Sequence, residues 1–154
     1  MRRLIALIIG TLLLQTALLR TVQAQTIEKG SSPVGLWKTI DDKTGQPRGI
    51  IRIYEVNHRY FGRLERSLEP GQEGRKCSAC TDERKDQPMK GLVFMRNLEL
   101  NNGEYSGGDI LDPETGTVYR CSFKLDDNRN VLTVRGYVGV SVFGRTQKWL
   151  REPG

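Results

Sequence analysis

The segment LTVRGYVGVSVFGRTQKWLR, Leu132 to Arg151, decides the fold because it has the pattern of a closing β-hairpin. Apolar and polar residues alternate as far as Val138, Gly139 lies near the turn, and the chain then runs back to Leu150. Each strand gains one face on which large apolar groups and arginines are mixed. These faces consist of Val131, Thr133, Arg135 and Tyr137 on the first strand and Phe143, Arg145, Gln147 and Trp149 on the second. If they point inward, the fold encloses charge, which must be paired or meet a ligand.

Six more segments with strand patterning precede this hairpin, which brings the total to eight short strands. They cover residues 34–40, 49–56, 60–68, 92–95, with a continuation to residue 100 as an alternative, 104–111 and 117–125. Short runs of turn formers join most of them, such as Asn101-Asn102-Gly103. No amphipathic helix of ten or more residues is indicated after the leader described next. Consecutive hairpins predict an all-β fold, an eight-stranded antiparallel up-and-down barrel. Closure removes exposed edges and leaves room for side chains or one small ligand.

The first 24 residues have the organisation of a secretory signal peptide. Arg2 and Arg3 form a positive start, residues 4–19 are almost wholly apolar, and Val22-Gln23-Ala24 is a small-x-small cleavage site. A membrane anchor is the alternative, although the apolar run is short for a spanning helix. We therefore expect residues 1–24 to be removed. Residues 25–33 then form an extended lead-in, and residues 34–154 form a single barrel domain.

The charge of the exported chain argues against nucleic acid as a partner. Removing the leader lowers the count of basic residues from 24 to 21 against 18 acidic residues, so the net charge falls from +6 to +3. Both signs are interspersed, and no basic run or regular aromatic interleaving is present.

A long polar segment, residues 69–91, interrupts the rhythm of strands and contains Cys77 and Cys80 in a C-x-x-C spacing. Three interpretations are open: a structural disulfide, a redox pair, or a metal site with Cys121 and the distant His58. Export to an oxidising compartment favours a disulfide, most simply Cys77–Cys80, although a bridge from either to Cys121 remains an alternative. Cys121 lies on a strand face with Tyr119 and is expected to be a buried, inert thiol.

Two resemblances support the barrel. Gly35-Leu36-Trp37 resembles the Gly-x-Trp that opens lipocalin chains, which implies that Trp37 plugs the barrel base with an arginine of the last strand packed over it. Arg145 and Arg151 are both candidates for that arginine. The chain is also similar to a bacterial family of small secreted proteins of unknown function with a lipocalin-like barrel. The matching stretches are GLWKTIDDKTGQPRGIIRIYE, CSACTDERKDQPMKGL, GGDILDPETGTVYRCSFKL and the closing hairpin. This resemblance implies a periplasmic or secreted bacterial protein and implies little about activity.

No catalytic constellation is indicated. The chain has one histidine, and nothing places a serine or cysteine beside it. The acidic residues at positions 41, 42, 109, 112 and 114 lie at predicted turns, where short polar side chains are favoured. No phosphate loop or dinucleotide fingerprint occurs. We therefore expect no enzymatic activity, no cofactor and no bound metal.

The hypothesis that follows is an exported barrel that binds a small amphipathic or anionic ligand. The candidate ligand-binding residues are Tyr119, Arg135, Tyr137 and Arg145, and the candidate structural residues are Gly35, Trp37 and Trp149. The alternative is an interaction module that contacts an envelope protein through its cysteine loop and outer face, with its barrel filled by side chains. An open interior of a few hundred cubic ångströms supports binding, and a filled one supports the alternative. Neither hypothesis requires a stable membrane anchor.

Overall fold

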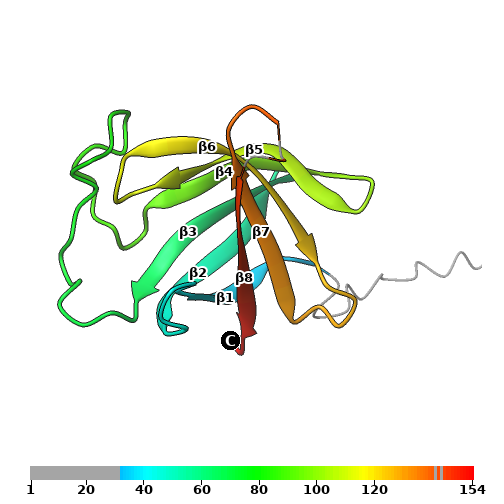
Figure 1. Cartoon of the computed structure of the whole chain (residues 1–154), viewed down its shortest axis with the longest axis horizontal. Coiled ribbons are helices and arrows are strands. Elements are labelled where there is room, and N and C mark those ends of the chain that lie inside the picture. Colours follow the sequence, from blue (N-terminus) through cyan, green and yellow to red (C-terminus); the bar gives the residue numbers. More distant parts are fainter. Residues whose placement is uncertain (1–31, 141, 143) are drawn as a thin grey trace, which may run out of the picture.

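The computed structural model describes residues 32–140, 142 and 144–154. The described chain forms a closed barrel of antiparallel strands in sequence order (Figure 1). The strands are β1 (Gly35–Ile40), β2 (Pro47–Val56), β3 (Arg59–Ser67), β4 (Val93–Asn101), β5 (Glu104–Asp112), β6 (Thr117–Leu125), β7 (Val131–Tyr137) and β8 (Gly144–Glu152). Each strand pairs with the next, and β8 pairs back with β1. The predicted eight-stranded up-and-down barrel is confirmed.

The predicted signal peptide and residues 25–31 of the predicted lead-in lie outside the described residues. Within the described part of the chain, no helix is long and apolar enough to cross a membrane.

The turns divide the barrel into a base and a mouth. At the base, β2 and β3 are joined through Asn57 and His58, and β4 and β5 through Asn102 and Gly103, all four with positive φ. Such two-residue turns match the twist of the flanking strands. The mouth is the opposite end, where the β1–β2, β3–β4, β5–β6 and β7–β8 connections lie, and it includes the long cysteine-bearing segment. The three longest connections, β1–β2, β3–β4 and β7–β8, therefore lie at the mouth.

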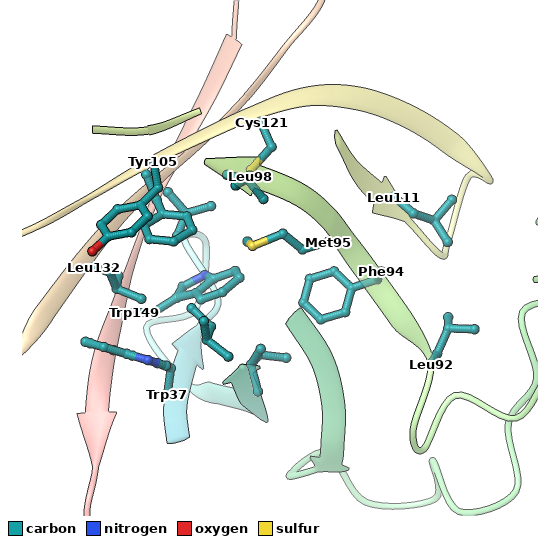
Figure 2. Packing of buried hydrophobic residues seen from close by; sticks show 14 of the residues in the cluster. Trp37, Leu92, Phe94, Met95, Leu98, Tyr105, Leu111, Cys121, Leu132 and Trp149 are labelled. Atoms are coloured by element: carbon teal, nitrogen blue, oxygen red, sulfur yellow. The ribbon is translucent and has the colours of Figure 1, made fainter. Parts of the chain in front are cut away.

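The hydrophobic core fills the base half of the barrel and extends to Cys77, Cys80 and Leu92 of the cysteine-bearing connection. Trp37, Ile53, Met95 and Leu98 are completely buried, and Trp149 lies between Trp37 and Met95 in Figure 2. Tyr105 stacks on Phe123 with 4.6 Å between ring centres, and Tyr60 meets Tyr105 edge-on at 4.8 Å. Offset and edge-on aromatic pairs of this kind add to the free energy gained by burial.

In the closing hairpin, the face of β7 that points into the barrel is the opposite of the predicted one. Leu132 and Val134 are buried, whereas Thr133 is exposed. Arg135 therefore lies on the outer face, where it donates hydrogen bonds to Thr146 Oγ1 at 2.6 Å and to the carbonyl of Val142 at 2.9 Å. The prediction that the face carrying Arg135 points inward is wrong. Both faces of this strand contain apolar residues, and the inward face is the one without a charge, which avoids burying it.

The inward face of β8 agrees with the prediction. Trp149 is buried, and its cross-strand neighbour is Leu132. Gln147 and Arg145 follow on the same face toward the mouth, opposite Val134 and Gly136. Phe143, predicted on this face, lies outside the described residues.

The base is closed by Trp37, as the lipocalin resemblance implies. Trp37 is completely buried, and its indole Nε1 donates a hydrogen bond to the carbonyl of Pro33 at 2.8 Å. The arginine that covers it is Arg151, whose guanidinium carbon lies 4.2 Å from the ring centre. Gly35 has φ +142°, and a Cβ at this position would lie 3.2 Å from Nη1 of Arg151. A glycine here therefore leaves room for the arginine to reach the tryptophan.

The cysteine loop, residues 76–92, is a packed unit. Cys77 and Cys80 form the predicted disulfide, and both are buried. The loop lies against the β5–β6 turn so closely that a Cβ on Gly116 would overlap the carbonyl oxygen of Ala79. Cys121 is the free cysteine; it is buried in the barrel, and desolvation raises the pKa of its thiol to about 12. These findings confirm the predicted pairing and the predicted burial of Cys121.

Candidate functional site

The barrel contains a cavity of about 770 Å³ that extends from its interior to the mouth. Its wall is made by apolar side chains from strands around the barrel. They include Ile51, Leu64, Phe94, Ile110, Val134 and Trp149. The volume lies within the range of sites that hold small organic ligands. The barrel is therefore filled at its base and open toward its mouth.

The register of the strands explains why space remains in the upper half. Gly49 and Gly136 line the cavity at positions where a larger side chain would project inward. A Cβ on Gly136 would lie 3.3 Å from Cγ2 of Ile110, which lies two strands away on β5. At the base, by contrast, inward positions carry large side chains such as Trp37 and Phe123.

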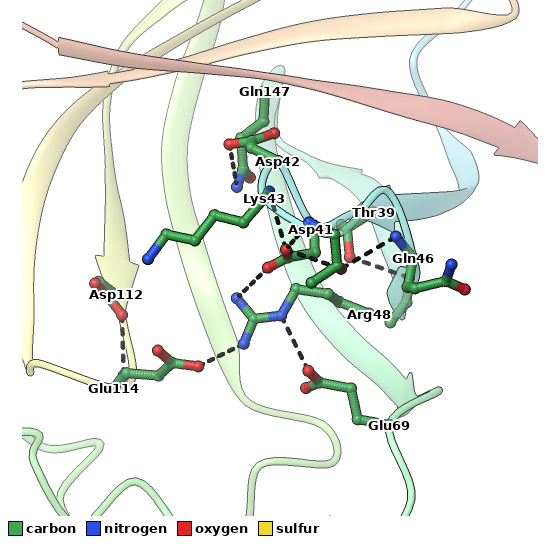
Figure 3. Close-up of polar contacts among 12 residues, drawn as sticks. Thr39, Asp41, Asp42, Lys43, Gln46, Arg48, Glu69, Asp112, Glu114 and Gln147 are labelled. Carbon is green, nitrogen blue, oxygen red and sulfur yellow. Dashed lines mark hydrogen bonds and ion pairs between the residues drawn. The ribbon is translucent and has the colours of Figure 1, made fainter.

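Arg48 holds three loops of the mouth together. Its guanidinium contacts Glu69 of the cysteine-bearing connection at 3.4 Å and Asp41 of the β1–β2 loop at 3.9 Å, and it donates a short hydrogen bond to Glu114 of the β5–β6 turn (Figure 3). Partial burial by itself lowers the pKa of Arg48, but the contacts with Glu114 and Glu69 outweigh it and the pKa is raised. Because Arg48 contacts one carboxylate from each of three connections, it holds these connections together at the mouth.

The β1–β2 loop is itself held in shape by Asp41. Its Oδ1 accepts hydrogen bonds from the backbone N–H groups of Thr44 and Lys43, at 2.8 and 3.0 Å, and from the Thr44 hydroxyl at 3.0 Å. The bonds from Thr44 lower the pKa of Asp41. Because these hydrogen bonds fix the loop, the next residue, Asp42, is held beside Arg145 and Gln147, which line the cavity.

Arg145 of β8 pairs with Asp42, which lies in the loop after the neighbouring strand β1. Its Nη2 and Nε lie 2.7 and 2.8 Å from Oδ2 of Asp42. Gln147 also donates to that oxygen at 3.5 Å, and its own Oε1 accepts a hydrogen bond from the indole of Trp149 at 3.3 Å. A polar chain thus runs from the loop at the rim down to the buried tryptophan in the wall. An anionic ligand that used Arg145 would compete with Asp42.

Other charged residues complete the rim. The lining includes the basic residues Arg48, Arg66, Arg75, Lys90 and Arg145 and the acidic residues Glu69, Glu73, Asp112 and Glu114. Arg66 and Lys90 make no ion pair with any residue that the structure describes, so their charges are available to a ligand. Sequence reasoning missed both, because neither belongs to a motif and the register of β3 is needed to bring Arg66 to the rim.

The structure brings together three of the four predicted ligand-binding residues. Tyr119 and Arg145 line the cavity, and Tyr137, although it shares the outer face of β7 with Arg135, borders the cavity at the mouth, where the strand ends. Arg135 does not, because its side chain lies on the outer face of β7. Trp149 was predicted to have a structural role. It belongs to the hydrophobic core and also forms part of the cavity wall.

The described residues contain no group of three or more histidine, cysteine, aspartate or glutamate side chains arranged to hold a metal ion. His58 lies in the turn at the base, with its Nδ1 3.5 Å from Glu55, at the opposite end of the barrel from the cavity.

Comparisons with known proteins agree with this architecture. The model of a family described as "Uncharacterized protein conserved in bacteria (DUF2147)" matches residues 35–151. No curated protein shows significant similarity to the chain. Among solved structures, protein HP1028 from Helicobacter pylori, described as belonging to the lipocalin family, is similar with a TM-score of 0.69 and 18% sequence identity, over 79% of this chain and 84% of that one. At this identity the likeness concerns the fold. Because the family model matches residues 35–151, which is most of the chain, the chain belongs to the uncharacterised bacterial family DUF2147.

Proposed function

We propose that this protein binds a small amphipathic molecule, with the apolar part in the barrel and a polar, preferably anionic, head group at the rim. The observation that carries the proposal is the cavity of about 770 Å³, which has an apolar wall and a charged mouth. Apolar enclosure supplies the affinity, and a few polar groups at one end orient the ligand.

Arg66 and Lys90 support the preference for an anion. Both line the rim, and neither is neutralised by a carboxylate of the described residues. Arg145 adds a third cation whose partner, Asp42, lies on a loop. The planar guanidinium of arginine can bind a carboxylate or phosphate through two parallel hydrogen bonds.

The fold is similar to that of a protein described as a lipocalin. This similarity is in keeping with a binding protein and supports no catalytic role. The rival hypothesis, an interaction module with a filled barrel, is less well supported because the upper half of the barrel is open. The organisation of residues 1–24 supports export, so we place the binding function in the periplasm or outside the bacterial cell.

Three ligands with the same tail and different heads test the proposal: decanoate, decanol and decylamine. Calorimetric titration of the full chain should show the order decanoate, decanol, decylamine from tightest to weakest. Native mass spectrometry of protein recovered from the periplasm then identifies whether a ligand of this class is retained. Failure of all three ligands to bind would argue for the interaction module, and tightest binding of decylamine would overturn the preference for an anion.

Substitutions at the rim locate the head group. The double variant R66A and K90A should lower the affinity for decanoate to about that of decanol, because the two unpaired cations are removed. The matched control is Lys124→Ala, a lysine on the outer face of β6 paired with Glu104. It should leave the affinity for all three ligands unchanged.

A further inference from the structure

The β7–β8 tip, residues 138–140 and 142, is the most exposed apolar feature of the described chain. Val138, Val140 and Val142 have exposed fractions of 64%, 62% and 77%. Each exceeds the value of every other exposed large hydrophobic residue described, of which Leu100 at 55% is the nearest. The turn stands clear of the strands at the top of Figure 1. Exposed apolar side chains gathered in one segment commonly mark a surface of interaction.

Basic side chains surround the foot of this tip. Arg120 pairs across β6 and β7 with Tyr137, the residue directly before the tip, and it is exposed. Arg135 is anchored to the tip itself through its hydrogen bond to the Val142 carbonyl. Arg145 follows the tip on β8, and its side chain is 59% exposed.

The acidic groups nearby offset only part of this charge. Asp42 is paired with Arg145. Asp109, the cross-strand neighbour of Arg120 on β5, is bonded instead to Arg96 at 3.2 Å. Arg120 is exposed and makes no ion pair with a described residue, so its positive charge remains beside the apolar tip.

We propose that the β7–β8 tip docks on the surface of a bilayer that contains anionic phospholipids. The valines enter the boundary between head groups and acyl chains, and the arginines at the foot of the tip contact lipid phosphates. Apolar insertion and basic attraction act together in proteins bound at membrane interfaces. The exposed side chains of Val138, Val140 and Val142 have no polar group and suit a hydrocarbon environment.

Docking would also set the mouth of the barrel toward the lipid. Val138, Tyr137 and Arg145 belong both to the tip or its foot and to the lining of the cavity. A lipid-derived amphiphile would then pass between the bilayer and the cavity over a short path. This consequence rests on the proposed function, whereas the docking itself does not.

Co-sedimentation of the full chain with vesicles tests the docking without any added ligand. The protein should sediment with vesicles of phosphatidylethanolamine and phosphatidylglycerol at low salt and much less with phosphatidylcholine vesicles. Raised salt should weaken the binding, because the arginine contacts are screened. The double variant V140S and V142S should lower the partition coefficient by about tenfold or more, since each inserted valine contributes through its buried apolar area.

The matched control is V56S with L100S, which removes two exposed apolar side chains at the base. This variant should sediment as the original protein does. Arg120→Glu should weaken binding to the anionic vesicles and leave the weak binding to neutral ones unchanged.

Equal sedimentation of the tip variant and the original protein would overturn the proposal. So would a dimer in solution that V140S and V142S dissociate while no vesicle binding occurs, because a second copy would then cover the tip. Titration of the same variants with decanoate tests the proposed function separately. Loss of vesicle binding with unchanged decanoate binding concerns the docking alone.

Discussion

Arg151 of the last strand lies over the indole ring of Trp37 in the first strand, with 4.2 Å from the guanidinium carbon to the ring centre. The same guanidinium donates hydrogen bonds to the carbonyls of Ser32, at 3.0 Å, and Arg129, at 2.6 Å. The arginine thereby ties the lead-in and the β6–β7 turn to the tryptophan that closes the base. Since the first and last strands must pair for the barrel to close, this contact stabilises the closure itself.

Truncation of the plug should be costly. Trp37→Ala should lower the free energy of unfolding by about 3–5 kcal/mol, the range for buried aromatic side chains, as measured by urea denaturation followed by circular dichroism. Arg151→Met, which keeps much of the packing and loses the hydrogen bonds and the cation–π contact, should cost about 1–2 kcal/mol. Lys148→Met, an exposed position of the same strand, is the control and should change little. A loss below about 1 kcal/mol for Trp37→Ala would mean that the base is held by other contacts.

The cysteine loop should lose stability in acid through Asp82. Hydrogen bonds from the side chain and backbone of the nearly buried Arg84 lower the pKa of Asp82 to about 2. A carboxyl whose pKa is depressed in the folded state stabilises the fold fully above its unfolded pKa of about 3.9. That contribution is lost as the pH falls through about 2. Unfolding free energies measured between neutral pH and pH 2 should show this decline.

Substitution separates Asp82 from the other carboxylates. Asp82→Asn should cost about 1–3 kcal/mol at neutral pH, because Arg84 is left buried without its partner, and the decline in acid should become shallower. Asp86→Asn is the matched control, since Asp86 lies in the same loop with an exposed side chain. If both variants have the same acid profile as the original protein, Asp82 is not the group that titrates.

The three thiols should be distinguishable by alkylation. In native protein no cysteine should react, because Cys77 and Cys80 are joined and Cys121 is buried. Reduction should expose two reactive thiols, slowly, since the buried disulfide is reached only when its loop opens. Cys121 should react only after denaturation, and raising the pH to about 9 should not change this, because burial raises its pKa to about 12. Reaction of a cysteine in native, unreduced protein would contradict the pairing.

Much of the fold follows from local chemistry that the sequence displays. Asn102-Gly103 and Asp112 to Gly116 form the turns that their residue types favour, and alternation places Tyr119, Cys121 and Phe123 on an inward face. These signals act over a few residues, so they can be recognised without knowing the rest of the chain.

The mouth could not be predicted in the same way. Arg48 and Glu114 are 66 residues apart, and Arg145 and Asp42 are 103 apart, so their pairing depends on the registers of several strands together. The same registers decide that Arg151 covers Trp37 while Arg145 lies at the mouth. The inward face of β7 was predicted wrongly because its two faces are both partly apolar, and only packing against Trp149 and the core selects Leu132 and Val134.

The pair formed by Asp42 and Arg145 should limit the affinity for anions. Asp42 now neutralises a guanidinium that lines the cavity, at 2.7 Å. In Asp42→Asn the arginine keeps its position and loses its competing carboxylate, so decanoate should bind several-fold more tightly while the affinity for decanol is unchanged. Arg145→Gln should have the opposite effect on decanoate alone. Asp127→Asn, an exposed aspartate in the β6–β7 turn at the base, is the control and should alter neither affinity. Because the three changes alter charge at constant or similar volume, an equal change in decanol binding would show that Asp42 and Arg145 shape the mouth and do not select the charge of the ligand.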